Sequence, residues 1–238
     1  MRARLAALAV LAAAAVGCGS SNSSSGLPST LTAVIGGKTF TPAEVVFVPP
    51  VQSAPPGCNV SGMNVPLTAM VLGFSETPGM CGILQNSCAG KKGFAFAGAV
   101  LGKGVLSSGA TPPPAPDFPV NADFTVYSNT QTTQLMNAAL IHQVVQASFA
   151  VTETTDASTC AYPAAPSYLS GKIHIDSVTA TEVKGTIDAT AANGDSVRGP
   201  FSATPCAVPG FEACALLSTT GGNPWTPSTC GGTMTCSP

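Results

Sequence analysis

The sequence predicts an all-β protein, an antiparallel β-sandwich or barrel with a C-terminal three-strand meander and a cysteine-rich tail. The 238 residues include 21 prolines and 25 glycines, which interrupt any long helix. Between these breaks, short runs are either apolar or alternate between apolar and polar residues, as strands do. With 45% apolar and only 8% charged residues, the chain can bury a core and lacks the composition of a disordered chain.

The predicted strands follow one another at short intervals. They cover residues 31–35, 38–48, 67–74, 94–101, 120–127 and 143–153. Gly36 and Gly37 lie between the first two runs and predict a hairpin turn. In the last run, Phe149 and Val151 belong to an apolar set that alternates with polar or small residues, which predicts one buried face. Residues 130–141 are the one place where the sequence favours a short helix.

Residues 171–204 predict the meander, because three alternating runs are separated by short turns. We expect loops at 179–181 and 192–194, the second with Gly194 in the left-handed conformation. The resulting facing pairs keep apolar residues on one side and opposite charges on the other: Ile173 with Ile187, Ile175 with Gly185, Lys172 with Asp188, Asp176 with Lys184, Ala189 with Val197, Asp188 with Arg198, and Gly185 with Phe201. We expect Phe201 to cover the backbone of Gly185, and Pro200 predicts an edge or bulged third strand.

The charged residues of this meander bring acids, bases and cations together. They are Lys172, His174, Asp176, Lys184, Asp188 and Arg198. Such a set could be mistaken for a catalytic site, but cross-strand pairs of opposite charge are also typical of an exposed sheet surface. We interpret them as the solvated face of the sheet.

The first 17 residues have the pattern of an export signal. Arg2 and Arg4 precede an apolar run over residues 5–16, which is shorter than the roughly 20 residues that cross a membrane. Ala15-Val16-Gly17-Cys18 resembles the lipobox of bacterial lipoproteins, in which the cysteine thiol is diacylated and the cysteine becomes the N-terminus after cleavage. The resemblance implies a lipid on Cys18. Ordinary cleavage that leaves Cys18 as a spare thiol is the alternative.

The remaining cysteines indicate how the exported part is stabilised. Residues 18–29 are a Gly/Ser-rich tether, and residues 30–238 are a single β-rich domain that ends in the cysteine-rich tail, 205–238. The domain has eight cysteines, an even number that predicts disulfides in an exported protein: Cys58, Cys81, Cys88, Cys160, Cys206, Cys214, Cys230 and Cys236. Their pairing stays open, because eight cysteines allow many connectivities. No Cys-x-x-Cys occurs, which argues against a zinc site.

Charge and motifs argue against several classes of function. Nine Lys plus Arg against eleven Asp plus Glu give a net charge of −2, so the chain lacks the clustered cations of a nucleic-acid binder. Neither Gly-x-Ser-x-Gly nor His-Glu-x-x-His occurs. Asn193 and Asp195 are explained by a hairpin turn rather than by calcium. We predict no catalytic residue, no metal site and no cofactor.

Several segments together resemble a group of uncharacterised bacterial lipoproteins with small β-rich, disulfide-bearing domains. They are LGFSETPGMC at 72–81, Cys160 followed by Ser-Gly-Lys-Ile at 170–173, and Val-Lys-Gly-Thr-Ile-Asp at 183–188 leading to Gly-Pro-Phe-Ser-Ala at 199–203 and Cys206. The resemblance implies an exported β-sheet domain and carries no activity with it.

We therefore expect a lipid-anchored protein of the bacterial envelope that acts as a structural or interaction module and not as an enzyme. Gly19 after the lipidated cysteine resembles the pattern sent to the outer membrane in Gram-negative cells, whereas in a Gram-positive host the anchor would be in the cytoplasmic membrane. The expected partners are the membrane, through the lipid on Cys18, and an envelope protein, glycan or apolar ligand. A lipocalin-like carrier is the first alternative, in which Phe94, Phe96, Val100 and Leu101 could line the cavity or could equally pack a sandwich core. An envelope hydrolase built around His142 is the second.

Overall fold

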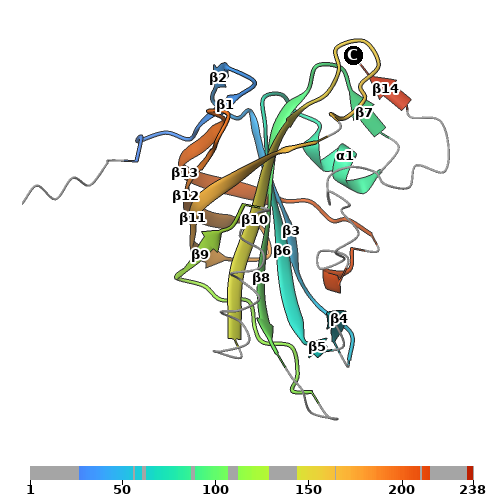
Figure 1. Cartoon of the computed structure of the whole chain (residues 1–238), viewed down its shortest axis with the longest axis vertical. Coiled ribbons are helices and arrows are strands. Elements are labelled where there is room, and N and C mark those ends of the chain that lie inside the picture. Colours follow the sequence, from blue (N-terminus) through green and yellow to red (C-terminus); the bar gives the residue numbers. More distant parts are fainter. Residues whose placement is uncertain are drawn as a thin grey trace, which may run out of the picture.

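Figure 1 presents the computed structural model of the chain, which is built almost entirely of β-strands. The structure describes residues 27–55, 57–60, 63–86, 89–106, 112–128, 144–163, 165–209, 211–214 and 235–237. Within them the elements are β1 (Thr32–Ile35), β2 (Lys38–Phe40), β3 (Glu44–Gln52), β4 (Cys58–Val60), β5 (Met63–Val65), β6 (Leu67–Ser75), α1 (Met80–Gln85), β7 (Ala89–Lys91), β8 (Ala95–Val105), β9 (Ala122–Val126), β10 (Val144–Thr154), β11 (Ser167–Val178), β12 (Val183–Ala191), β13 (Ser196–Pro205) and β14 (Thr235–Ser237). The all-β prediction is confirmed. The helix expected at residues 130–141 lies outside the described residues.

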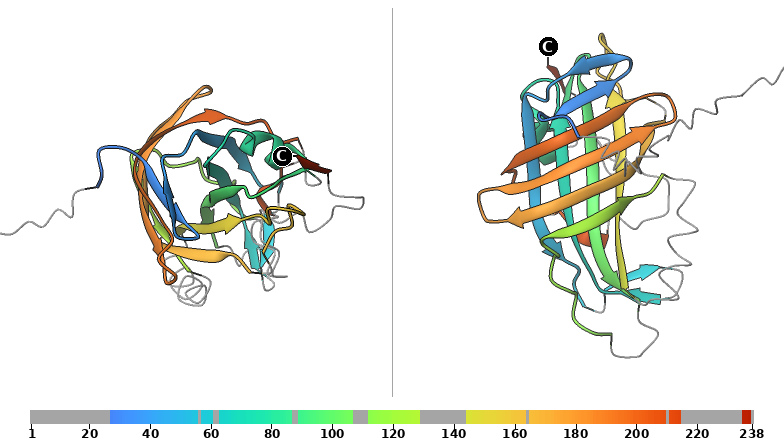
Figure 2. Two further views of the ribbon diagram at one scale, coloured as in Figure 1. Left: turned by 90° about the horizontal axis from the view of Figure 1, so that it is seen from above. Right: turned by 90° about the vertical axis from the view of Figure 1, so that its left-hand side faces the viewer.

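Eight strands close into a barrel. Their order is β12-β11-β9-β10-β8-β6-β3-β13, and β13 pairs again with β12. Seen from above, the strands surround a common interior, and from the side β9, β11, β12 and β13 cross over the long strands β3, β6, β8 and β10 (Figure 2). The β1–β2 hairpin extends the sheet from β13, with Ala33 opposite Val197.

The interior of the barrel is filled by apolar side chains. One cluster of buried residues takes members from all eight strands and from β1, among them Phe47, Met70, Leu72, Phe124 and Leu169. On β8 the inward residues are Ala97 and Ala99, which lie opposite Phe74 and Leu72 of β6. Small residues therefore face large ones across the strand pair, as expected where a narrow barrel must be packed with side chains.

The predicted register of the meander is confirmed at all but one pair. Asp188 faces Arg198, and Gly185 faces Phe201. The exception is Lys184, which faces Ser177 and not Asp176, because a bulge between Ile175 and Ser177 adds a residue to β11. Gly194 has a φ of 92°, as the predicted loop requires.

The edge or bulge predicted from Pro200 is wrong for β13 as a whole, which has strands on both sides, although residues 199–203 pair with β12 alone. Residues 196–198 pair with β1, and Thr204 and Pro205 pair with β3. Pro200 faces Thr186 of β12 and lies between these two pairings. The missing N–H of proline therefore removes no hydrogen bond to β1 or β3.

Two further predictions, the extent of the run at 38–48 and the buried face of the run at 143–153, are corrected by the structure. The run predicted at 38–48 is divided at Pro42, since β2 ends at Phe40 and β3 begins at Glu44. In β10 the inward residues are Ser148, Ala150 and Thr152, and Val151 packs on the outside of the barrel. The larger apolar residues of this strand therefore face an outer layer.

A second apolar core lies outside the barrel, over β3, β6, β8 and β10. It includes Val46, Val71, Phe94, Phe96 and Val100, together with Met80 of α1 and Cys206. The prediction that Phe94, Phe96 and Val100 line an internal cavity is therefore wrong. Of the four residues proposed for that role, Leu101 alone belongs to the internal cluster.

Three disulfides join described residues on the outside of the barrel. They join Cys58 to Cys214, Cys81 to Cys206 and Cys160 to Cys236. The prediction of disulfides is thus confirmed for six of the eight cysteines, and Cys88 and Cys230 lie outside the described residues. Each bridge closes a long loop, which restricts the unfolded chain.

A buried carboxylate connects the β12–β13 turn to the β1–β2 turn and to β10 at one end of the barrel. Asp195 in the β12–β13 turn is only 4% exposed. Its Oδ1 accepts a hydrogen bond from the backbone N–H of Gly36 at 2.9 Å, and its Oδ2 accepts one from the hydroxyl of Thr152 at 2.6 Å. Asp195 therefore fixes the β1–β2 turn and β10 to the meander.

Gly185 is one of the positions of the meander that have no room for a side chain. A Cβ there would lie 2.1 Å from the carbonyl oxygen of His174 and 2.9 Å from the ring of Phe201. We predict that Gly185→Ala lowers the free energy of unfolding by more than about 2 kcal/mol, measured by urea denaturation. Gly82→Ala in α1 is the control, because its Cβ would meet nothing within 4 Å, and its effect should stay within about 1 kcal/mol. Equal stabilities of the two variants would contradict this account.

Candidate functional site

The outer face of β9, β11, β12 and β13 carries the charged residues that the meander predicts. Arg198 Nε donates a hydrogen bond to Asp188 Oδ1 at 2.7 Å, and this contact raises the pKa of Arg198. His174 lies between two carboxylates, with Nδ1 2.6 Å from Asp123 Oδ1 and Nε2 3.3 Å from Asp176 Oδ1. The cluster is thus a set of ion pairs on an open sheet surface.

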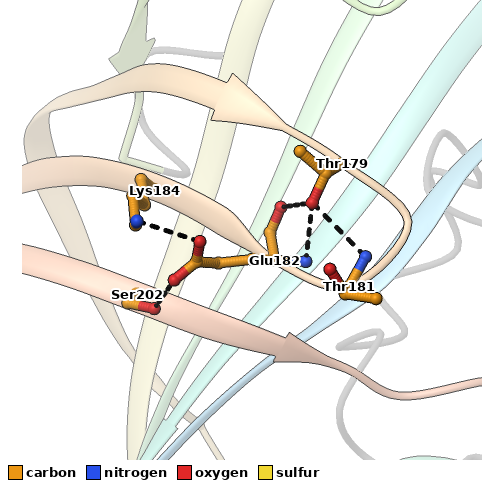
Figure 3. A network of polar contacts seen from close by, with 5 residues as sticks. All are labelled: Thr179, Thr181, Glu182, Lys184 and Ser202. Atoms are coloured by element: carbon orange, nitrogen blue, oxygen red, sulfur yellow. Dashed lines mark hydrogen bonds and ion pairs between the residues drawn. The ribbon is translucent and has the colours of Figure 1, made fainter.

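A second polar network closes the β11–β12 turn (Figure 3). Glu182 accepts a hydrogen bond from the hydroxyl of Ser202 at 2.7 Å, which lowers the pKa of its carboxyl, and it pairs with Lys184 at 3.0 Å. Thr179 Oγ1 accepts hydrogen bonds from the N–H groups of Thr181 and Glu182. These exposed contacts shape a turn and add little to stability.

A buried carboxyl lies on the opposite, covered side of the barrel. Glu153 of β10 is 2% exposed and faces Phe96 of β8. Burial raises the pKa of Glu153 to about 7. The ring of Tyr162 packs edge-on against Phe96 at 6.2 Å, and its pKa is raised to about 12, first by burial and then by the charge of Glu153. Within the described part of the chain, the Tyr162 hydroxyl has no hydrogen-bond partner.

The loop that covers Glu153 is rigidly built. Asp156 Oδ1 accepts hydrogen bonds from the hydroxyl of Ser158 at 2.6 Å and from the N–H groups of Thr159 and Ser158 at 2.7 and 2.8 Å, and these bonds keep the Asp156 pKa well below its usual range. Thr155 Oγ1 accepts the N–H of Phe94, and Cys160 bonds to Cys236. Glu153 is therefore a buried carboxyl at the end of β10, next to a loop that hydrogen bonds and a disulfide hold in place.

The polar face ends at a groove of about 410 Å³ beside β11 and the β12–β13 turn. It is lined by Ser128, Ser167, Tyr168, Ser170, Ala191, Ala192 and Asn193. A smaller hollow of about 260 Å³ is lined mainly by prolines near the other end of the barrel, including Pro55, Pro66 and Pro112. Of the two, the first alone combines several hydroxyl and amide groups, so it is the candidate binding site of the described surface.

Sequence reasoning predicted part of these arrangements. The ion pair between Asp188 and Arg198 was expected from the meander register, whereas Asp123 was not placed beside His174, since no local pattern indicates that β9 pairs with β11. Glu153 occupies a strand position where a charged residue usually points to solvent, and no feature of the sequence indicates that it is buried. Cys18 and His142 lie outside the described residues.

The described residues contain no group of three or more His, Cys, Asp or Glu side chains arranged to hold a metal ion. No helix in the described ranges is long and apolar enough to span a membrane. The fold and surface thus define a closed eight-stranded barrel with a disulfide-clamped outer layer. Comparison with known protein families, curated proteins and solved structures finds no significant match to this chain.

The buried carboxyl predicts how stability depends on pH. Since folding raises the pKa of Glu153 from 4.5 to about 7, the folded state binds more protons than the unfolded state between these values. The free energy of unfolding then falls as pH rises through this window, by at most about 3 kcal/mol. We expect the free energy of unfolding of Glu153→Gln to lack this decrease. Measured by urea denaturation, the variant should therefore become more stable relative to the wild type as the pH rises from 4.5 to 8.

Glu182→Gln is the matched control for this measurement. Its carboxyl is exposed and its pKa is lowered, so its contribution to stability changes below the window and not within it. A difference between wild type and Glu153→Gln that stayed constant from pH 4.5 to pH 8 would contradict the assigned burial of the charge.

Proposed function

We propose that this protein is a lipid-anchored lipoprotein of the bacterial envelope, in which a rigid β-barrel serves as an interaction module. The leader that ends at Cys18 and the resemblance to β-rich, disulfide-bearing bacterial lipoproteins support the anchor and the location. The disulfides support an oxidising compartment, where such bonds persist.

The packed barrel interior is the observation that favours an interaction module over a carrier. Met70, Leu72, Leu101, Leu169 and Ile173 all face the interior and all have 0% exposure. A residue that lined a void large enough for a water molecule would have some accessible surface, so the interior around these residues is solid. Binding is therefore assigned to the outer surface.

The tether supports a position close to the membrane. The barrel begins at Leu31, which is buried, and the backbone of Thr30 lies against Gly199 of β13. A Gly/Ser-rich segment as long as the one between Cys18 and Leu31 has a root-mean-square span of about 20 Å. The module would then act on partners near the membrane surface.

Replacement of the acylated cysteine tests the anchor. We expect Cys18→Ser to yield a protein without lipid that moves from the detergent phase to the aqueous phase in a phase-partitioning experiment, because no acyl chain is left to hold it. Ser24→Ala, within the same Gly/Ser-rich segment, should partition like the wild type. Detergent partitioning of Cys18→Ser equal to that of the wild type would overturn the anchor.

A lipocalin-like carrier is the second candidate, and the closed ring of eight strands favours it. At the end of the barrel away from Asp195, the inward-facing side chains change from apolar to polar. Lys103 of β8 lies on the inward side by alternation with Leu101, faces Thr68 and Gln146, and is half-buried. An apolar ligand with an anionic head would place that head here.

Native mass spectrometry of protein purified from its host envelope separates the two candidates. Because the interior is filled, we expect the mass of the protein alone, with no small molecule retained. A stoichiometric apolar ligand in the spectrum, lost on Lys103→Glu, would favour the carrier and displace the interaction module as the proposed function. Lys92→Glu, an exposed lysine outside the barrel, is the control for the change of charge.

A further inference from the structure

We infer that the groove beside β11 binds a neutral saccharide. This inference rests on the proposed function and deepens it, because it assigns the outer-surface binding to one site and one class of ligand.

The groove lies where three strands meet at a fork. β9 pairs with β10 as far as Val126, and the N–H of Tyr127 still bonds to the carbonyl oxygen of Ser148. Beyond this point β10 pairs directly with β11, from Ala150 opposite Leu169. β9 ends at Val126, and Ser128, Tyr168 and Ser170 line the groove next to this junction. The volume of about 410 Å³ lies within the range of small-molecule sites.

Among the described residues, the lining carries no charged side chain. Its polar groups are the hydroxyls of Ser128, Ser167, Tyr168 and Ser170 and the amide of Asn193, and its apolar parts are two alanines and the tyrosine ring. Hydroxyls both donate and accept hydrogen bonds, as do the hydroxyls of a sugar. Tyr168 packs partly against the outer core and stays partly exposed, and the exposed part of its ring offers an apolar surface for the C–H face of a pyranose. An ionic ligand would find no counter-charge among these residues.

Ser167, Ser170 and Asn193 are held in place by hydrogen bonds and keep unused hydrogen-bonding capacity. Asn193 Nδ2 donates to Ser167 Oγ at 2.8 Å, and Asn193 Oδ1 accepts the N–H of Asp195. Ser170 Oγ donates to the carbonyl oxygen of Thr190 at 3.3 Å. The proton of Ser167 Oγ, the second N–H of Asn193 and a lone pair of Ser170 Oγ remain for a ligand. A fixed set of donors and acceptors lowers the entropy cost of binding.

The test is binding of the full-length protein to an array of neutral oligosaccharides that includes maltotriose, cellotriose and triacetylchitotriose. The protein is kept in a detergent without a sugar headgroup, and the best ligand is then measured by calorimetry. We expect a dissociation constant in the micromolar to millimolar range, typical of a small open site. Ala192→Trp, at an exposed turn position, should fill the groove and weaken binding at least tenfold. Tyr168→Phe, which keeps the packing and removes the hydroxyl, should weaken it several-fold.

Ala180→Trp is the matched control, because Ala180 is exposed in the turn at the other end of β12. This variant should bind like the wild type. The inference is overturned if no neutral oligosaccharide binds, if trigalacturonic acid binds better than its neutral counterparts, or if Ala192→Trp binds like Ala180→Trp. Partitioning of Cys18→Ser is read separately, so loss of the anchor and loss of the saccharide site are distinct results.

Discussion

The closure of the sheet is the constraint on which the rest of the structure depends. β13 pairs with β12 along one edge and with β1 and then β3 along the other, so the ring of eight strands joins back to its start. In a closed ring each strand has one inward and one outward face, and a slip of one residue would exchange them. The bulge in β11, the bare backbone at Gly185 and the carboxylate of Asp195 each keep the meander in the one register that permits closure.

Closure also explains why the protein has two apolar cores. A barrel of this size encloses few side chains, yet the outward faces of β3, β6, β8 and β10 are apolar as well. The short helix α1 and the segments around Cys160 and Cys206 cover this surface, and because they are largely irregular, disulfides secure them. Among the described residues, no comparable layer covers the opposite side of the barrel, and this open side belongs to the outer surface to which we propose that partners bind.

The sequence predicts the strand register best where charged residues mark the solvent-exposed face of the sheet. In the meander, Asp188 and Arg198 label the solvent face, so the register follows from the charges alone. In β8, Phe96 and Ala97 point to opposite faces of the sheet, but both faces are apolar. The size of these residues does not indicate which face lies inside the barrel. In the candidate groove, Ser170 and Asn193 belong to predicted elements, but Ser128 reaches them through the pairing of β9 with β11, a contact between distant segments that no local pattern encodes.

The pairing of the cysteines has a consequence for the order of folding. Cys58 and Cys81 find their partners 156 and 125 residues further along the chain, and the bridge from Cys160 to Cys236 overlaps both. During synthesis the chain emerges N-terminus first. The N-terminal cysteines therefore cannot pair, and β3 cannot pair with β13, until the C-terminal segments have been made. Native bridges can therefore form only when nearly the whole chain has emerged. This favours slow folding with a high contact order and a need for thiol protection or disulfide isomerisation on the way.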